Sequence, residues 1–241
     1  MEFHILSLFT EMFNSVFDSS IIKKARDRKL IEIFLHNIRD YTYDSHRVTD
    51  DYPYGGGAGM VLKVEPIARA LKNIEEEKGP SYKIMMGPQG NLFNQDKAKE
   101  LANHTRVIII CGHYEGVDER VRQYFIDEEI SIGDYVLSGG EIAAMVVTDT
   151  VSRLIPGVLG NSLSIETESF SSNLLDYPQY TRPREYLGLE VPEVLLSGNH
   201  AEIRNWRLRE AFRKTVENRP DLLGDKKLSP EQEKLLKSVK E

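Results

Sequence analysis

The sequence predicts an α/β domain with a largely parallel sheet, followed by a smaller helical domain. Through the first two thirds of the 241 residues, short apolar segments of strand length alternate with helical patterns. After Pro156 this alternation stops, and serine, glycine and proline replace any sustained period. A hydrophobic content of 40% with 29% charged residues is typical of a globular protein, and the length allows one or two domains with their own cores.

Four segments have the length and the β-branched or aromatic composition of strands: residues 3–9, 31–35, 83–86 and 107–111. Helical patterns between and after them predict helices at residues 11–26, from Val64 onward, and at residues 94–103 and 141–154. Pro66 suits the first turn of the second helix, and Asn94 suits the N-cap of the third. Strands that alternate with helices in this way predict parallel pairing.

The second part of the chain is predicted to be helical. Residues 157–173 contain five serines and two glycines, so residues 161–173 are expected to be a flexible linker between domains at 1–160 and 174–241. Leu208, Ala211, Phe212 and Thr215 lie at i, i+3, i+4 and i+7, which predicts a helix from His200 onward. A final helix is expected to begin at Ser229, with Pro230 as its first residue.

The charge of the chain is unevenly distributed. The net charge is −7, yet residues 204–227 contain eight basic residues and four acidic ones. Arg209 and Arg213 lie one turn apart beside Trp206, on a different helix face from the apolar stripe. This arm is a candidate RNA-binding surface, because binding depends on where the charge is located. An ordinary solvated helix face is the alternative.

Several classes of site are not expected. One cysteine excludes a disulfide framework and a multi-cysteine zinc site, and the six histidines show no metal-ligand spacing, so no metal site is predicted. The first residues, MEFHILSLFTEMF, lack a basic segment and a cleavage site, and indicate a strand rather than a signal peptide. No apolar run approaches the length of a membrane span. A cytoplasmic protein that does not bind membranes is expected.

Glycine-rich segments follow three predicted strands or strand-like segments, at residues 85–90, 111–120 and 131–141. Since α/β sheets bind ligands at the carboxyl ends of their strands, these segments predict one composite pocket. A side chain at Gly140 would then occupy ligand space. For residues 111–120 a salt-bridged turn is the alternative.

Cys111 is either a nucleophile beside His113 or, more commonly, a buried core residue. Residues 50–60, with four glycines in five positions, are either a substrate loop or a flexible loop.

The sequence resembles the bacterial tRNA (guanine-N1)-methyltransferases, which belong to the SPOUT class and modify the guanosine 3′ of the anticodon. The matching motifs are DDYPYGGGAGMVLKVEP (50–66), GPQG (87–90), CGHYEGVDERV (111–121), EISIGDYVLSGGEIAAMVVTDTVSRLIPGVLG (129–160), LLDYPQYTRP (174–183) and VPEVLLSGNHAEIRNWR (191–207). They run nearly from end to end and in order, so together they are far more specific than any single glycine motif.

The resemblance implies a trefoil-knotted parallel-sheet domain that binds S-adenosylmethionine, an exception to the rule that chains do not form knots. It also implies a small all-helical C-terminal domain that binds tRNA, and a homodimer with its sites at the interface. The implied reaction is methyl transfer to N1 of guanosine 37 (m1G37). A non-catalytic RNA-binding member of the same fold is the alternative, and a Cys111-dependent pyrimidine methyltransferase is a more distant one. The need for Mg²⁺ is left open.

The resemblance also assigns roles to individual residues. S-adenosylmethionine contacts fall on Pro88, Gly112, Tyr114, Glu115, Ile132, Gly133, Asp134, Tyr135, Val136, Leu137, Gly139 and Gly140. The predicted substrate contacts are Asp50 and Gly59, together with Arg209 and Arg213, which the charge pattern of the basic arm indicates. Arg153 matches the arginine near guanine O6, and Glu168 stands where the family has its catalytic aspartate. His113 stands where many relatives have arginine. A carboxylate that accepts the N1 proton, and an arginine that stabilises charge on O6, suit this reaction.

Overall fold

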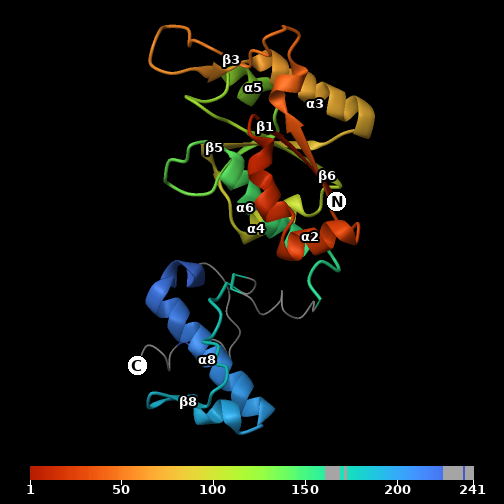
Figure 1. Cartoon of the computed structure of the whole chain (residues 1–241). Helices are drawn as coiled ribbons and strands as arrows, with labels where there is room; N and C mark the ends of the chain where they lie inside the picture. Colours follow the sequence, from red (N-terminus) through yellow and green to blue (C-terminus); the bar gives the residue numbers. More distant parts are fainter. Residues whose placement is uncertain (161–168, 171–172, 225–235, 237–241) are drawn as a thin grey trace. The chain divides into compact units, whose positions relative to one another are not determined.

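The computed structural model describes residues 1–160, 169–170, 173–224 and 236 (Figure 1). The chain divides into two compact units, Met1–Gly160 (unit 1) and Asn161–Glu241 (unit 2), and each is described separately. Glu168 and the helix expected from Ser229 lie outside the described residues. Over the ranges that are described, no helix is long and apolar enough to cross a membrane.

Unit 1 is built on a five-stranded sheet with the order β2-β1-β6-β5-β7. Its strands are β1 (Glu2–Ser7), β2 (Glu32–Asn37), β5 (Tyr82–Leu92), β6 (Arg106–Cys111) and β7 (Glu128–Ser131). Every neighbouring pair is parallel, and Ile5 of β1 lies opposite Leu35 of β2 and Ile109 of β6. The predicted α/β fold with a parallel sheet is confirmed. All five strands therefore end at the same edge.

Helices cover both faces of this sheet (Figure 1). Because side chains alternate along a strand, Ile109 of β6 packs into one apolar cluster while Ile108 and Ile110 pack into another. The first face is covered by η1 (Thr10–Phe13), α1 (Asn14–Phe17), α2 (Ser20–Asp27), α4 (Gln95–Leu101) and α6 (Glu141–Leu154). The second is covered by η2 (Ile38–Tyr41), α3 (Val64–Lys78) and α5 (Glu119–Tyr124). Burial on both faces explains the uninterrupted apolar run of β6.

Some elements differ from the sequence prediction. The single helix expected at residues 11–26 is wrong: the chain forms η1, α1 and α2, and α2 begins at Ser20 with a φ of +52°. The strand β7 was missed because it begins with two glutamates. In the structure Glu128 accepts hydrogen bonds from Lys97 and from the Tyr82 hydroxyl, and these partners compensate its charge. The helix α5 was missed because its charged residues were interpreted as a loop.

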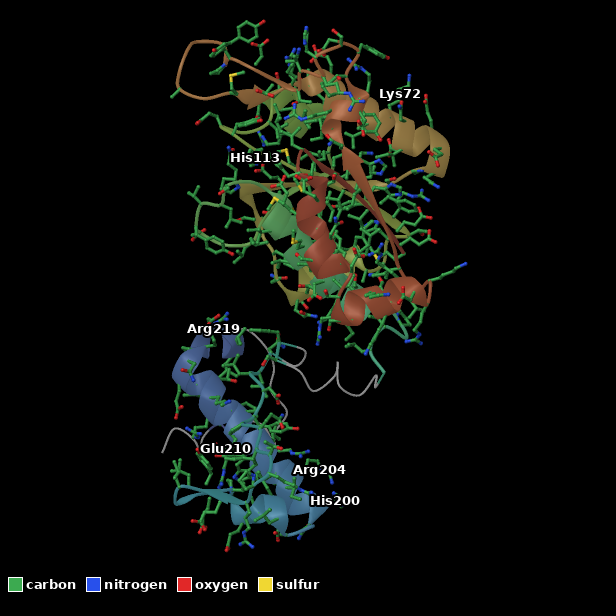
Figure 2. All side chains as sticks on the ribbon, viewed as in Figure 1. Lys72, His113, His200, Arg204, Glu210 and Arg219 are labelled. Atoms are coloured by element: carbon green, nitrogen blue, oxygen red, sulfur yellow. The ribbon has the colours of Figure 1, made fainter. Side chains whose placement is uncertain are left out.

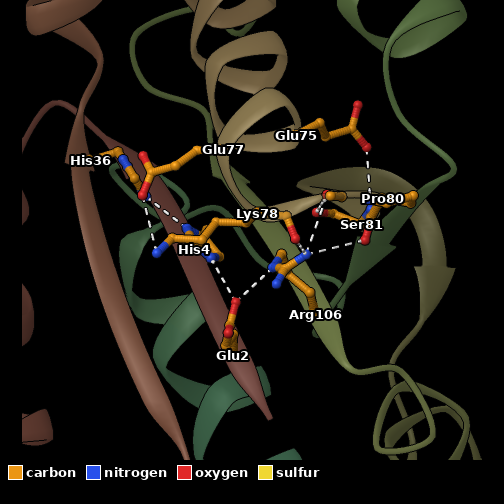
Figure 3. Close-up of polar contacts among 10 residues, drawn as sticks. Glu2, His4, His36, Glu75, Glu77, Lys78, Pro80, Ser81 and Arg106 are labelled. Carbon is orange, nitrogen blue, oxygen red and sulfur yellow. Dashed lines mark hydrogen bonds and ion pairs between the residues drawn. The ribbon is translucent and has the colours of Figure 1, made fainter.

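A polar network begins at the first residues of β1 and β6 (Figure 3). Arg106 donates to Glu2 at 2.6 Å, His4 and His36 share a hydrogen bond of 2.9 Å between Nδ1 and Nε2, and His36 contacts the Tyr41 hydroxyl at 2.8 Å. Burial lowers the pKa of His36 to about 4 and also lowers the pKa of His4. The lowered pKa values favour the neutral form of both histidines, and the network connects β1, β2 and β6.

Unit 2 is organised around α8 (His200–Asn218), with the 3₁₀ turns η3 (Glu193–Leu196) and η4 (Pro220–Leu223). The Asn199 side chain caps α8 by accepting from the Ala201 and Glu202 amides. The predicted apolar stripe is confirmed, since Phe212 and its neighbours form the core of unit 2. The other core residues are Leu174, Ala211, Tyr177, Leu208, Leu223 and Leu236.

The expectation that the second domain is all-helical is wrong in one place. Strands β8 (Glu185–Tyr186) and β9 (Leu189–Glu190) form a short antiparallel hairpin. Its turn residues, Leu187 and Gly188, have φ values of +54° and +78°. Positive φ at both central positions is the geometry that two-residue hairpins favour. The turn was missed because leucine occupies the position where asparagine or aspartate usually gives the signal.

Candidate cofactor-binding site

A cavity of about 360 Å³ lies at the ends of β6 and β7, beside residues 86–88 of β5. Its walls come from residues 86–88 inside β5, where the register with β7 shifts between Met86 and Asn91, and from the glycine-rich segments at the ends of β6 and β7. The lining residues are 86–88, 112–116, 130–133, 135–140 and Ala143. The volume is within the range of small-molecule sites, and the carboxyl edge of a parallel sheet is the usual place for one.

The structure brings eleven of the twelve predicted cofactor residues to this cavity. They are Pro88, Gly112, Tyr114, Glu115, Ile132, Gly133, Tyr135, Val136, Leu137, Gly139 and Gly140. Asp134 is the exception: it is exposed and does not line the cavity, although its neighbours on both sides do. The other lining residues were not named as cofactor contacts, and all but Ile130 and Ala143 lie in the three segments predicted to form the pocket: Met86, Gly87, His113, Gly116, Ile130, Ser131, Ser138 and Ala143. Their positions between or beside the glycine motifs were the available signal.

The floor of the cavity is formed where two loops meet. The Gly140 amide donates to the Gly112 carbonyl at 2.8 Å, and His113 pairs with Gly139 through an antiparallel bridge. A Cβ at Gly140 would lie 2.8 Å from the Cys111 Cα and 3.1 Å from the Gly112 nitrogen. Gly140 lines the cavity as expected, but the first obstacle that a side chain at 140 would meet is the backbone at the end of β6. Glycine is required there for close backbone approach.

The glycine-rich segment at residues 50–60 is attached to one wall of the cavity. The Glu115 amide donates to the Met60 carbonyl at 3.0 Å, and the Leu62 amide donates to the Gly116 carbonyl at 2.9 Å. A Cβ at Gly59, whose φ is +83°, would collide with the Glu115 side chain. Asp50 pairs with Leu62 where β3 (Asp50–Asp51) and β4 (Val61–Leu62) meet, and it does not line the cavity.

A buried carboxylate lies behind the cavity wall. Glu141, in the first turn of α6, is 2% exposed, and its Oε1 accepts a hydrogen bond of 2.7 Å from Ser7. Its Oε2 is 3.9 Å from Nδ1 of His113, which is buried and has no hydrogen-bond partner within the described part of the chain. The Phe9 ring contacts the His113 ring at 4.8 Å between centroids. Figure 2 shows His113 on unit 1. His113 therefore has one ring nitrogen covered by the protein and placed beside the buried Glu141 carboxylate, while the residue itself lines the cavity.

Cys111 is a core residue. Its side chain is fully buried in the apolar cluster, and burial raises the pKa of its thiol well above the usual value. A thiolate is the nucleophilic form of cysteine, so burial of this kind makes the side chain inert. This finding removes the alternative of a Cys111-dependent pyrimidine methyltransferase.

Arg153 does not line the cavity. Arg153 is in the last turn of α6, and at 1.5 Å per residue it is about 20 Å along the helix from Gly140. In unit 2, Arg209 is exposed, whereas Arg213 forms ion pairs with Glu210 at 2.7 Å and Glu217 at 3.0 Å. These carboxylates offset much of the Arg213 charge.

The family model described as tRNA (Guanine-1)-methyltransferase TrmD matches residues 1–225. This chain belongs to that family. A tRNA (guanine-N(1)-)-methyltransferase of Carboxydothermus hydrogenoformans is 57% identical over 236 residues, which are 98% of this chain and 92% of the relative. The corresponding protein of Dehalococcoides mccartyi is 54% identical over 240 residues, 99% of this chain and 97% of the relative.

A solved structure of the family is similar along most of the chain. The crystal structure of tRNA (m1G37) methyltransferase from Aquifex aeolicus matches with a TM-score of 0.76 and 42% identity, covering 92% of this chain and 94% of that one. The family resemblance stated from the sequence motifs is thus confirmed. No group of three or more histidine, cysteine or acidic side chains among the described residues is placed to hold a metal ion.

Proposed function

We propose that the chain transfers a methyl group from S-adenosylmethionine to N1 of guanosine 37, the nucleotide 3′ of the anticodon in tRNA. The observation that carries this proposal is the family match over residues 1–225, and the glycine-walled cavity supports it. Relatives at 54–57% identity that cover nearly the whole chain support an enzyme rather than a non-catalytic RNA-binding member of the fold.

The cavity fits S-adenosylmethionine in size and chemistry. Its glycines expose backbone N–H and C=O groups, which need partners and which a purine edge can supply. The His113 ring also contributes to the lining. Residues 112–116 and 132–140 would hold the cofactor, which supplies a methyl group activated on a sulfonium. The protein then has to position the target base in line with that methyl group.

Two side chains would carry the chemistry on the guanine. N1 bears a proton and is a poor nucleophile until the proton leaves, so we assign Glu168 as the base that accepts it. Negative charge then develops toward O6, where the Arg153 guanidinium would stabilise it. Glutamate keeps the carboxylate of the family aspartate and adds one methylene group. Asp50 and Gly59, on the segment attached to the Glu115 loop, would contact the tRNA.

A homodimer would complete the site. Arg153 lies a helix length from the cavity floor of its own chain, too far for an arginine side chain to span. On α6, the apolar residues Ile142 and Val146 lie one turn apart with more than a third of their surface exposed. Met12 and Val16, on elements that cover the same sheet face, are similarly exposed. An apolar face of this kind suits burial against a second copy, which would bring Arg153 to the partner's cavity.

We also assign a trefoil knot to unit 1. β6 lies between β1 and β5, whereas β7 lies beyond β5. After β7 the chain returns to the end of β6, where Gly140 contacts Gly112. This return past the loop that follows β5 supports threading of the chain, which the family resemblance implies. Unit 2 would bind tRNA, with Arg209 on its exposed helix face. We expect a cytoplasmic location, and Mg²⁺ remains a candidate requirement.

The test is a single-turnover assay with two tRNA transcripts that differ only in having guanine or adenine at position 37. The proposal requires methyl transfer to the guanine transcript and none to the adenine transcript, with N1-methylguanosine identified by mass spectrometry after digestion. Binding of both transcripts without transfer to either would favour the non-catalytic alternative.

A further inference from the structure

A second cavity, of about 450 Å³, lies wholly within unit 2. It is formed by residues 177–182 and 184, by the η3 turn, and by α8 at Ile203 and Arg207. The Val191 amide donates to the Arg184 carbonyl at 2.9 Å, so the start of the β8–β9 hairpin joins two parts of the wall. The cofactor proposal does not involve this cavity.

The charges that line this cavity are all positive. Arg182, Arg184 and Arg207 contribute to the lining, which contains no aspartate or glutamate. Over the described ranges none of these three guanidinium groups forms an ion pair. By contrast, Arg213 and Arg219 on the same unit are each bound by nearby carboxylates. Three uncompensated arginines around one cavity make it a site for an anion.

Aromatic rings lie beside the arginines in the lining of this cavity. The Arg207 guanidinium carbon lies 4.8 Å from the centroid of the Tyr177 ring, and Tyr177 packs against the core of unit 2. This contact holds one arginine in place before any ligand binds. Tyr180 also lines the cavity and is 49% exposed, with Trp206 at 6.3 Å between ring centroids. Tyr180 thus has a ring surface available for stacking.

We infer that this cavity binds one unpaired nucleotide of the RNA substrate, with its phosphate on the arginines and its base against Tyr180. Single-stranded RNA is recognised through this combination of guanidinium and aromatic groups. An acidic peptide would use the charge but not the exposed ring, and an apolar ligand would leave three cations unused. The inference rests on the proposed function, because that proposal makes RNA the substrate.

The experiment uses the full chain and a tRNA transcript with adenine at position 37, so that no turnover occurs. Trp206 is the only tryptophan in the chain, and its fluorescence reports on the neighbourhood of Tyr180. We expect tRNA to change this fluorescence in the unmodified protein. In Arg207→Ala, and in Arg182→Ala combined with Arg184→Ala, the affinity for tRNA should fall at least tenfold. The salt dependence should weaken by about one unit of log–log slope for each phosphate that the variant no longer neutralises.

Matched variants separate this inference from a general loss of charge. Arg219→Ala removes an arginine that is paired with Asp221 on the same unit, and it should keep its affinity for tRNA. In Figure 2, Arg219 lies at the opposite end of α8 from Arg204, which is three residues before Arg207 of the cavity. Tyr180→Phe should bind like the unmodified protein, whereas Tyr180→Ala should bind more weakly. S-adenosylmethionine affinity, measured by calorimetry, should be the same in all variants because that cavity belongs to unit 1.

Unchanged affinity and salt slope in both arginine variants would overturn the inference, as would an equal fluorescence response to poly-glutamate. These outcomes are distinct from failure of the proposed function. If the unmodified chain binds tRNA through this cavity but does not methylate the guanine transcript, the inference stands and the proposed reaction fails. If the arginine variants bind and methylate tRNA normally, the proposed reaction stands and the inference fails.

Discussion

Gly140→Ala tests how the cavity floor is built. The added Cβ would lie 2.8 Å from the Cys111 Cα, where ordinary contact begins near 3.4 Å, so a displacement of about 0.6 Å is needed. The obstacle is backbone at the end of β6, a strand held between β1 and β5, and it cannot rotate away as a side chain could. The backbone conformation at Gly140, φ −78° and ψ −7°, is open to alanine, so the effect comes from space alone.

Overpacking of this kind costs about 1–3 kcal/mol. For a domain of this size the melting temperature should fall by roughly 2–12 °C. The hydrogen bond between the Gly140 amide and the Gly112 carbonyl lies at the point of collision, so S-adenosylmethionine affinity should fall about tenfold or more, a loss of roughly 1.4 kcal/mol. Thermal denaturation followed by circular dichroism measures the first effect, and calorimetric titration measures the second.

Gly160→Ala is the control, because a Cβ there meets nothing within 4 Å and its melting temperature should be unchanged. A Gly140→Ala protein with the stability and cofactor affinity of the unmodified chain would refute the reasoning. Loss of stability with normal affinity would show that the floor is not part of the cofactor site.

Three further predictions follow from single residues. Glu168→Gln should slow single-turnover methyl transfer by roughly 10²–10⁴-fold with unchanged cofactor affinity, while Glu168→Asp should retain substantial activity. Because the pKa of His36 is lowered from 6.5 to about 4 in the folded state, the unfolded chain takes up the proton first. Denaturant titrations should therefore show stability falling between about pH 6.5 and 4, by on the order of 1–2 kcal/mol after allowance for partial exposure, and His36→Gln should lack this part of the loss. Iodoacetamide should modify Cys111 only when the protein unfolds, and rapid modification of the native protein would contradict its buried position.

The parts of the fold predicted best are those whose signal is local. The apolar run of β6 and the helix at residues 141–154 depend on composition and period alone. The strand β7 has no such signal, because the partners of Glu128 come from β5 and α4, which are distant in the sequence. The break before α2 depends on a left-handed conformation at Ser20, a residue type that rarely adopts it.

The cofactor cavity could be predicted as a set of strand ends, since parallel strands bring their carboxyl ends to one edge. The contacts between residues within the cavity walls could not be predicted from the sequence. Nothing in the sequence indicates that Gly140 meets Cys111, or that Glu141 is buried against Ser7 from the first strand. The spacing of Arg209 and Arg213 in the sequence predicts a basic helix face. The structure shows that Arg213 forms ion pairs with Glu210 and Glu217, which the spacing of the arginines alone does not indicate.

The cofactor cavity has walls from β5 and from the segments at the ends of β6 and β7, so it exists only when these strands are assembled in the sheet. A ligand that binds there binds the native state and not the unfolded chain. Its binding therefore raises the free energy of unfolding of unit 1 as a whole. Amides that exchange with solvent only through global unfolding, such as those in the centre of β1, should then exchange about 100-fold more slowly at a ligand concentration of 100 Kd. A protease that attacks only the globally unfolded chain should cleave the protein more slowly by the same factor, because the state it attacks becomes rarer.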